Sequence, residues 1–170
     1  MERILNKVRG NGTLPARPGL WQILNGLIGG ALGIGLVATL AELQHLPLLM
    51  APFGATCVLL FAAPDTPLAQ PRNVIGGHLV SSLVGLLFLK YVGTSPLEMG
   101  LAVGLAIALM QLTRTLHAPA GADPLVVLMA GKASWGFLIA PVLVSAVLLV
   151  LIALVVNNVG QGKQWPRYWM

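Results

Sequence analysis

The sequence APFGA at residues 51–55 and its near copy APAGA at residues 118–122 decide how this chain is expected to fold. Each places Pro-x-Gly directly ahead of an apolar run that is too short to cross a bilayer. Proline is favoured at the first position of a helix, where a backbone N–H would have no partner within the helix. Glycine lets backbone or a ligand approach closely because it has no Cβ atom. Both stretches therefore predict the start of a short helix.

The composition around these two motifs is that of an integral membrane protein. Of the 170 residues, 56% are hydrophobic and only 9% are charged. A soluble domain of this size exposes too much surface for polar residues to be so scarce. The one cysteine, Cys57, excludes an intrachain disulfide, and no Cys/His cluster has the spacing of metal ligands. We expect no metal and no cofactor.

The apolar runs predict an all-α, polytopic membrane bundle. Four runs approach the roughly 20 residues that a spanning helix needs, and they cover residues 20–43, 73–92, 97–116 and 135–156. Two runs, 48–63 and 118–131, are shorter. A helix of about 14 residues at 1.5 Å per residue reaches only about 21 Å, less than a hydrocarbon core of about 30 Å. We expect four long transmembrane helices and two short half-helices that are re-entrant or tilted. Six full crossings are the alternative.

Basic residues at the two ends of the chain predict its orientation. Residues 1–19 form a basic N-terminal tail, which contains Arg3, Lys7, Arg9 and Arg17. Residues 158–170 form a second tail, with Lys163 and Arg167. The positive-inside rule places both tails in the cytoplasm for either four or six crossings. We therefore expect a multi-pass protein of the inner (plasma) membrane, whose net charge of +5 serves contact with lipid headgroups and not with nucleic acid.

The two motifs indicate an internal repeat. A shift of 67 residues lays the first motif over the second, and each motif lies between two long apolar runs. The predicted architecture is therefore long helix, half-helix, long helix, written twice, over residues 20–92 and 97–157. Broken helices at corresponding positions of two repeats mark the substrate site in many transporters. Their free N–H groups and positive dipole ends favour a small anion.

The candidate binding residues lie in the motifs and beside them. Those in the motifs are Pro52, Gly54, Ala55, Thr56, Pro119, Gly121 and Ala122. His78 and His117 are ionisable groups next to a half-helix or within a span, with a structural hydrogen bond as the alternative role. Arg72 either guides anions or anchors its helix at the interface. Arg114 shares a helical face with His117 if the helix continues.

Asp123 conflicts with an anion at the second helix start, because a carboxylate there repels negative charge. Two explanations remain open. Asp123 either caps the helix and points away from the cavity, or it is protonated and takes part in proton-coupled movement. The residue at the same place in the first repeat, Thr56, has an uncharged hydroxyl. We therefore expect the two half-sites to differ chemically.

Two segments resemble the HPP family of integral membrane proteins. They are FGATCVLLF with PDTPLAQPRNVIGGH, in residues 53–78, and HAPAGADPL at residues 117–125. The resemblance covers about residues 20–156. One departure is that the His-Pro-Pro signature of the family reads His117-Ala118-Pro119 here. The resemblance implies a compact four-span bundle and, as in plant chloroplast and cyanobacterial members, nitrite transport.

These observations predict membrane transport of a small inorganic anion, with nitrite implied by the resemblance. The alternatives are a membrane scaffold or assembly subunit that does not transport, and a transporter or channel for another small solute. No arrangement of nucleophile, base or acid pair indicates an enzyme. Four spans are few to enclose a polar path, so we expect a homo-oligomer, with membrane lipid and the anion as further partners. Small-xxx-small spacing, as in Gly100 and Gly104, favours close helix packing.

Overall fold

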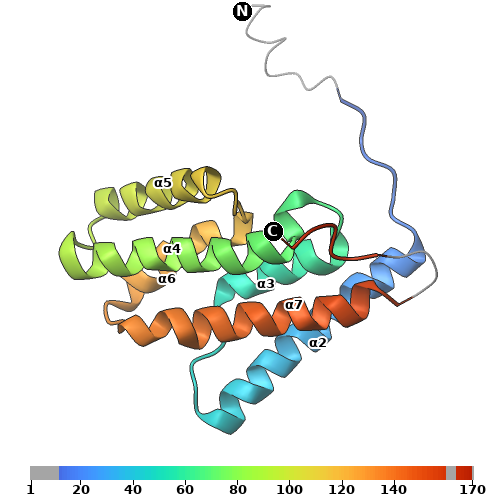
Figure 1. The fold of residues 1–170 in the computed structure, drawn as a ribbon, viewed down its shortest axis with the longest axis horizontal. Helices are drawn as coiled ribbons and strands as arrows, with labels where there is room; N and C mark the ends of the chain where they lie inside the picture. The colour runs from blue at the N-terminus through green and yellow to red at the C-terminus, as the bar shows by residue number, and fades with distance from the viewer. Residues whose placement is uncertain (1–11, 160–163, 170) are drawn as a thin grey trace, which may run out of the picture.

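The computed structural model describes residues 12–159 and 164–169, which form helices and their connections without a strand (Figure 1). The all-α prediction is confirmed for these residues. Arg3, Lys7, Arg9 and Lys163, which carry much of the predicted orientation, lie outside them. The elements in chain order are α2 (Leu20–Gln44), α3 (Ala51–Cys57), η1 (Val58–Ala62), η2 (Pro67–Ala69), α4 (Pro71–Tyr91), α5 (Pro96–Leu112), η3 (Ala118–Ala122), α6 (Asp123–Ala130), η4 (Trp135–Leu138), η5 (Ile139–Leu143) and α7 (Val144–Asn157).

Three helical segments are long and apolar enough to cross a membrane: Leu20–Gln44, Pro71–Tyr91 and Trp135–Asn157. The third joins η4, η5 and α7 and has a kink at Ala140, whose backbone angles are not helical. The fourth predicted run, 97–116, forms α5, a shorter helix of 17 residues that ends at Leu112. It ends early because Arg114 has a φ angle of 56°, in the left-handed region that a continuing helix cannot use. At 1.5 Å per residue α5 is about 25 Å long.

The start of α2, the end of η1 and the end of α7 lie together at one end of the bundle. Asn25 Nδ2 donates to Asn157 Oδ1 at 3.1 Å, and Gln22 Nε2 donates to the Ala62 carbonyl at 3.0 Å. The chain therefore leaves this end along α2 and is back at it by residue 62. The non-helical residues 45–50, α3 and η1 together make up this return, and α3 begins inside the bundle, where the Leu48 carbonyl accepts from Ser145 Oγ at 2.8 Å.

The return path is only partly helical. Residues 45–50 are not helical: His45 is in the left-handed conformation, and Leu48 N donates to the Leu46 carbonyl at 2.8 Å. The twelve helical residues of α3 and η1 add about 18 Å.

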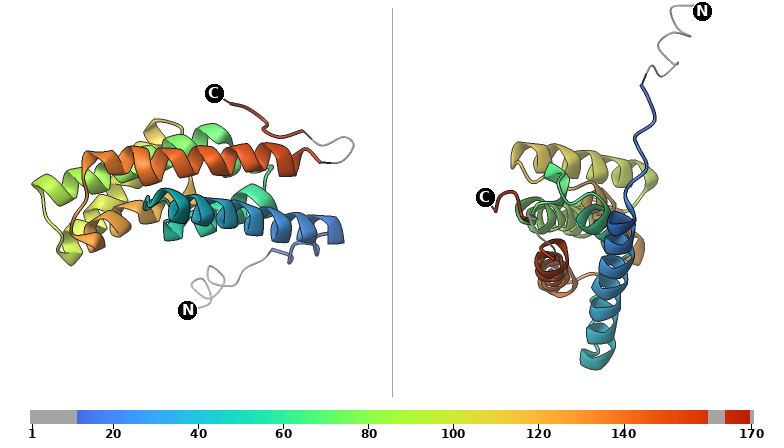
Figure 2. Two further views of the ribbon diagram at one scale, coloured as in Figure 1. Left: turned by 90° about the horizontal axis from the view of Figure 1, so that it is seen from below. Right: turned by 90° about the vertical axis from the view of Figure 1, so that its right-hand side faces the viewer.

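The outside of the bundle is strongly apolar. Leu97, Met129 and Val155 are each more than two-thirds exposed. Such side chains suit contact with lipid tails, where every backbone polar group must be satisfied within the protein. Figure 2 shows α2 inclined away from α4 and α7. The apolar outer surface therefore agrees with the composition, and both indicate a membrane protein.

Small residues bring α2 close to its neighbours. A Cβ atom on Gly33 would lie 3.1 Å from Leu149 Cδ2 and 3.2 Å from Cys57 Sγ, closer than ordinary contacts. The glycines of α5 behave differently, since positions Gly100 and Gly104 have no neighbouring atom within 4 Å. Small-residue packing therefore operates at α2 and leaves one face of α5 open.

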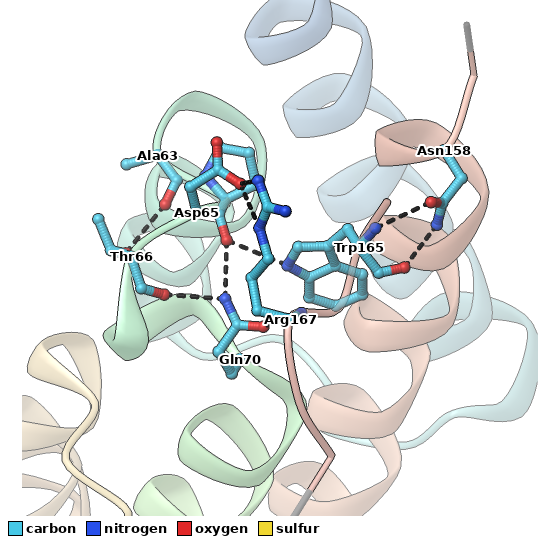
Figure 3. Close-up of polar contacts among 8 residues, drawn as sticks. Ala63, Asp65, Thr66, Gln70, Asn158, Trp165 and Arg167 are labelled. Carbon is cyan, nitrogen blue, oxygen red and sulfur yellow. Dashed lines mark hydrogen bonds and ion pairs between the residues drawn. The ribbon is translucent and has the colours of Figure 1, made fainter. Parts of the chain in front are cut away.

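The C-terminal segment 164–169 packs across the connection between η1 and α4 (Figure 3). Trp165 is 4% exposed, and its indole Nε1 donates to the Pro64 carbonyl at 3.2 Å. The backbone N–H of Arg167 donates to Gln70 Oε1 at 2.8 Å, and its guanidinium pairs with Asp65. This part of the predicted tail is thus held against the bundle.

Candidate functional site

Four buried polar side chains from separate segments meet inside the bundle. They are Thr56 of α3, His78 of α4, His117 just before η3, and Asp123 at the first residue of α6, and each is 0% exposed. All four were candidates from the sequence. We call this group the buried polar cluster.

The cluster is joined by a continuous row of short contacts. Thr56 Oγ1 lies 2.9 Å from His78 Nε2 and 3.0 Å from His117 Nε2. On one side, His78 Nδ1 lies 2.7 Å from Asp123 Oδ2. On the other, His117 Nδ1 lies 2.7 Å from the carbonyl oxygen of Leu68. The row therefore runs from a carboxyl group on α6 to the connection between η1 and α4.

Two adjacent glycines on α4 allow His117 to reach this row. A Cβ atom on Gly77 would lie 2.6 Å from His117 Cβ and 2.8 Å from the Thr115 carbonyl oxygen. A Cβ on Gly76 would lie 2.6 Å from Thr115 Cγ2. The segment before η3 can therefore lie against α4 only because these positions carry no side chain.

Asp123 turns into the bundle and does not cap its helix. Its Oδ2 accepts from Ser82 Oγ at 3.1 Å in addition to contacting His78, and no side-chain capping bond is formed at the start of α6. Its Oδ1 is buried and has no hydrogen-bond partner among the described residues. The capping explanation for Asp123 is therefore wrong. A buried carboxyl group is costly unless it is paired or neutralised, and His78 is the ionisable group that it contacts.

Aromatic rings close the cluster from the side. The His78 and His117 rings meet edge to face with centroids 4.9 Å apart, and the Phe53 ring packs against His78 in the same way at 5.0 Å. Phe53 is itself fully buried. The cluster is thus closed off from the molecular surface in this conformation.

The remaining motif residues lie between the two short helices, where the two prolines are buried and the two alanines are exposed. Pro52, Ala55, Pro119 and Ala122 line an open groove that is almost wholly apolar. Positions Gly54 and Gly121 face open space, with no atom within 4 Å of a Cβ placed there.

The two helix starts lie next to each other, because α3 packs against η3. The first backbone N–H after each proline already has a partner. Phe53 N donates to the Met50 carbonyl at 3.0 Å, and Ala120 N donates to the His117 carbonyl at 3.1 Å. These two amides are therefore not free to bind a ligand. The side-chain polar groups that lie near the starts of α3 and η3 are those of the buried polar cluster.

The two candidate arginines lie outside the cluster. Arg72 donates from Nη2 to the Thr113 carbonyl at 2.9 Å and from Nε to the Arg114 carbonyl at 3.2 Å, which satisfies carbonyls at the end of α5. Arg114 is exposed and follows the end of α5, so it does not share a helical face with His117. The condition for a shared helical face, that the helix continues through Arg114 to His117, is not met because α5 ends at Leu112.

Three groups near the cluster were not predicted. Ser81 and Ser82 lie three and four residues after His78, on the same face of α4, a spacing that could have identified them. Ser81 Oγ donates to the Ala120 carbonyl at 2.6 Å. The Leu68 carbonyl belongs to the backbone of a connection, so no side-chain pattern marks it. Within residues 12–159 and 164–169, no group of three or more His, Cys, Asp or Glu side chains is placed to hold a metal ion.

Comparison with known proteins shows the family. A family model for the HPP transmembrane region matches residues 15–166. Two curated transmembrane proteins of Dictyostelium discoideum are similar, one 40% identical over 132 residues, covering 74% of this chain and 46% of its own length. The other is 39% identical over 128 residues, covering 71% of this chain and 41% of its own. The chain thus spans less than half the length of these relatives, and no solved structure matches it. This chain belongs to the HPP family of transmembrane proteins.

Proposed function

We propose that this protein transports a small inorganic anion, nitrite, across the membrane. The observation that carries the proposal is the buried polar cluster, with two imidazoles and a carboxyl group that are 0% exposed in an apolar helical bundle. Ionisable side chains at such depth are costly, and in membrane proteins they mark ion, proton or substrate pathways. Nitrite, among small anions, comes from the resemblance to the plant and cyanobacterial members of the family.

The order of elements supports a binding site at the two helix starts. Long helix, short helix and long helix follow one another as α2, α3 and α4, and again as α5, α6 and α7. We propose that these are two repeats and that α5 serves as the fourth span. Thr56 and Asp123, which correspond in the repeats, both belong to the cluster. Transporters built from repeats bind their substrate where the broken helices of the two halves meet.

The conformation described here is closed. The cluster is sealed by side chains, and the groove between the half-helices offers almost no polar surface. We propose that the anion binds when α3 moves away from η3 and α6. Thr56 and His117 would then face the opening, and the Thr56 hydroxyl would supply a hydrogen-bond donor.

A flux assay with the full chain tests this proposal. Purified protein is reconstituted into liposomes, and nitrite uptake is compared with uptake by protein-free vesicles. Wild-type protein is expected to raise the uptake, and Gly54→Leu or Gly121→Leu to abolish the increase by filling the opening. Gly35→Leu is the matched control, because Gly35 on α2 also has open space at its Cβ position and lies away from the short helices. Uptake equal to that of empty vesicles favours a scaffold, and uptake of other solutes alone favours a different transporter.

Four further proposals accompany transport. We propose that the protein has no enzymatic activity, resides in the plasma membrane, and acts as a homo-oligomer. The open face of α5 at Gly100 and Gly104 supports association, since small residues let helices of two copies approach closely. We also propose that both ends of the chain are cytoplasmic. The contact between Asn25 and Asn157 supports this by holding the start of α2 and the end of α7 at one end of the bundle.

A further inference from the structure

The row of contacts in the buried polar cluster constrains how many protons the cluster holds. Four contacts join five groups in order: the Leu68 carbonyl, His117, Thr56, His78 and Asp123. Each contact is 2.7–3.0 Å long, and at such a distance one hydrogen must lie between the two atoms. Four contacts therefore require four hydrogens.

The ordinary charge states of these side chains supply only three. The Leu68 carbonyl and an ionised Asp123 can only accept, so Nδ1 of each histidine must carry a hydrogen. If both imidazoles are neutral, both Nε2 atoms are then acceptors. The two acceptors face the single hydroxyl hydrogen of Thr56, which can serve one of them. A third acceptor, the Pro52 carbonyl at 3.2 Å, competes for the same hydrogen.

We infer that the closed cluster holds one additional, dissociable proton, shared by Asp123 and His78, and that this proton is the coupling ion of transport. The proton makes His78 an imidazolium beside a carboxylate, or leaves a neutral imidazole beside a carboxylic acid. In both forms His78 Nε2 donates to Thr56, Thr56 donates to His117 Nε2, and His117 Nδ1 donates to Leu68. The coupling part of this inference rests on the proposed function, whereas the proton count does not.

Loss of the proton breaks the row at Thr56. One histidine Nε2 then faces an oxygen lone pair without a hydrogen, and that contact must lengthen. Thr56 is the member that α3 supplies, while His78, His117 and Asp123 are held by α4, by the segment before η3 and by α6. Proton release therefore favours separation of α3 from η3 and α6, which is the opening that an anion needs.

No other titratable side chain competes for this role among the elements packed around the cluster. α6 has no titratable residue besides Asp123, and α7 has none. The others point elsewhere: Cys57 toward Gly33 of α2, Arg72 to the end of α5, Lys90 over the Trp135 ring, and Glu98 to the backbone N–H of Ser95. Tyr91 at the end of α4 and Arg114 after α5 are exposed. The proton thus belongs to the Asp123, His78 and His117 groups alone.

Nitrogen-15 NMR of the histidines in the full-length protein tests the proton count without any transport. The chain has three histidines, and His45 in the turn after α2 is an exposed reference. Near neutral pH we expect His117 to carry a hydrogen on Nδ1. We also expect at least one of the two buried histidines to carry a hydrogen on Nε2. Neutral imidazoles at His78 and His117 that both lack an Nε2 hydrogen would overturn the inference.

The variant Asp123→Asn gives a second, independent test of the number of protons in the cluster. The side-chain amide can donate permanently to His78 Nδ1, as a protonated carboxyl group does, so the variant mimics the loaded cluster. We expect its His78 signals to show an Nε2 hydrogen and to stay unchanged over the pH range in which the wild-type signals move. Signals that titrate as in the wild type would contradict a proton shared with Asp123.

Coupling is tested in liposomes that contain a pH-sensitive dye and are given a nitrite gradient. Wild-type protein is expected to exchange one proton for each nitrite ion, because the closed form holds the proton and the anion enters only after proton release. Asp123→Asn and Thr56→Val are expected to lower proton movement at least tenfold. Thr39→Val is the matched control, because Thr39 makes the same hydroxyl contact to its own helix, with the Gly35 carbonyl, but lies exposed on α2.

The outcomes of the two assays separate the two claims. Nitrite movement without protons in the wild type overturns the coupling and leaves the proposed transport intact. Absence of nitrite movement in the wild type overturns the proposed transport and the coupling together, while the NMR result still decides the proton count.

Discussion

Gly77→Ala is the sharpest test of how α4 positions the buried polar cluster. The added Cβ atom would lie 2.6 Å from His117 Cβ and 2.8 Å from the Thr115 carbonyl oxygen. Carbon atoms pack at about 3.5–4.0 Å, so the segment before η3 must move away from α4 by about 1 Å. The His117 Nε2 to Thr56 Oγ1 distance, now 3.0 Å, would then exceed the range of a hydrogen bond.

The cost of this substitution has two parts. Overpacking a well-packed position costs about 1–3 kcal/mol. A buried imidazole nitrogen that loses its partner adds about 1–3 kcal/mol. Movement of the segment away from α4 lowers the overpacking cost but weakens the hydrogen bond of His117, so the two costs are not both paid in full. We therefore expect the free energy of unfolding to fall by about 2–4 kcal/mol.

Reversible unfolding of the purified protein in mixed micelles, followed by circular dichroism, measures this change. Gly104→Ala is the matched control, since it makes the same substitution within a helix where no atom lies within 4 Å of the new Cβ. Alanine there gains up to about 1 kcal/mol from helix propensity. If the two variants unfold within about 0.5 kcal/mol of each other, which is the usual range for surface changes, the close approach of His117 to α4 is wrong.

Three further substitutions probe the cluster and the C-terminal segment. Thr56→Val leaves two buried Nε2 atoms without a partner and should lower the free energy of unfolding by about 2–4 kcal/mol. The control Thr39→Val should change it by less than about 0.5 kcal/mol. Equal effects of the two substitutions would refute the role of the Thr56 hydroxyl. The Trp165 side chain is only 4% exposed, so Trp165→Ala leaves a cavity. It should lower the free energy of unfolding by about 3 kcal/mol and speed protease cleavage after α7. Unchanged cleavage would contradict the packing of Trp165. Asp65→Asn removes an ion pair whose side chains are 72% and 54% exposed, so its cost in the same unfolding assay should stay below about 1 kcal/mol; a larger loss would mean that the pair is shielded from water.

The helices that were predicted best are those whose signal is local. The runs 20–43, 73–92 and 135–156 became Leu20–Gln44, Pro71–Tyr91 and Trp135–Asn157. Their length and hydropathy are properties of consecutive residues, and lipid permits only helices that satisfy their own backbone at such positions. The run 97–116 was predicted too long because its break depends on the backbone at Arg114, a residue type that gives no sign of a left-handed conformation.

The path of the short helices was harder to predict. Helical rise alone predicted a half-helix for residues 48–63, and the structure shows that the non-helical residues 45–50 form part of the same return path. Contacts such as Gln22 to the Ala62 carbonyl, 40 positions apart, show where this segment ends. Such contacts leave no periodic trace in the sequence.

By itself the sequence determined that this chain is a helical membrane protein of the HPP type, and that Thr56, His78, His117 and Asp123 are candidates for a functional role. Tertiary structure alone decided that these four touch one another, that Arg72 and Arg114 stand apart, and that Asp123 turns inward. The physical reason is that the cost of placing a residue in lipid adds up residue by residue along the chain. A hydrogen bond instead depends on the distance and direction between atoms that different helices bring together.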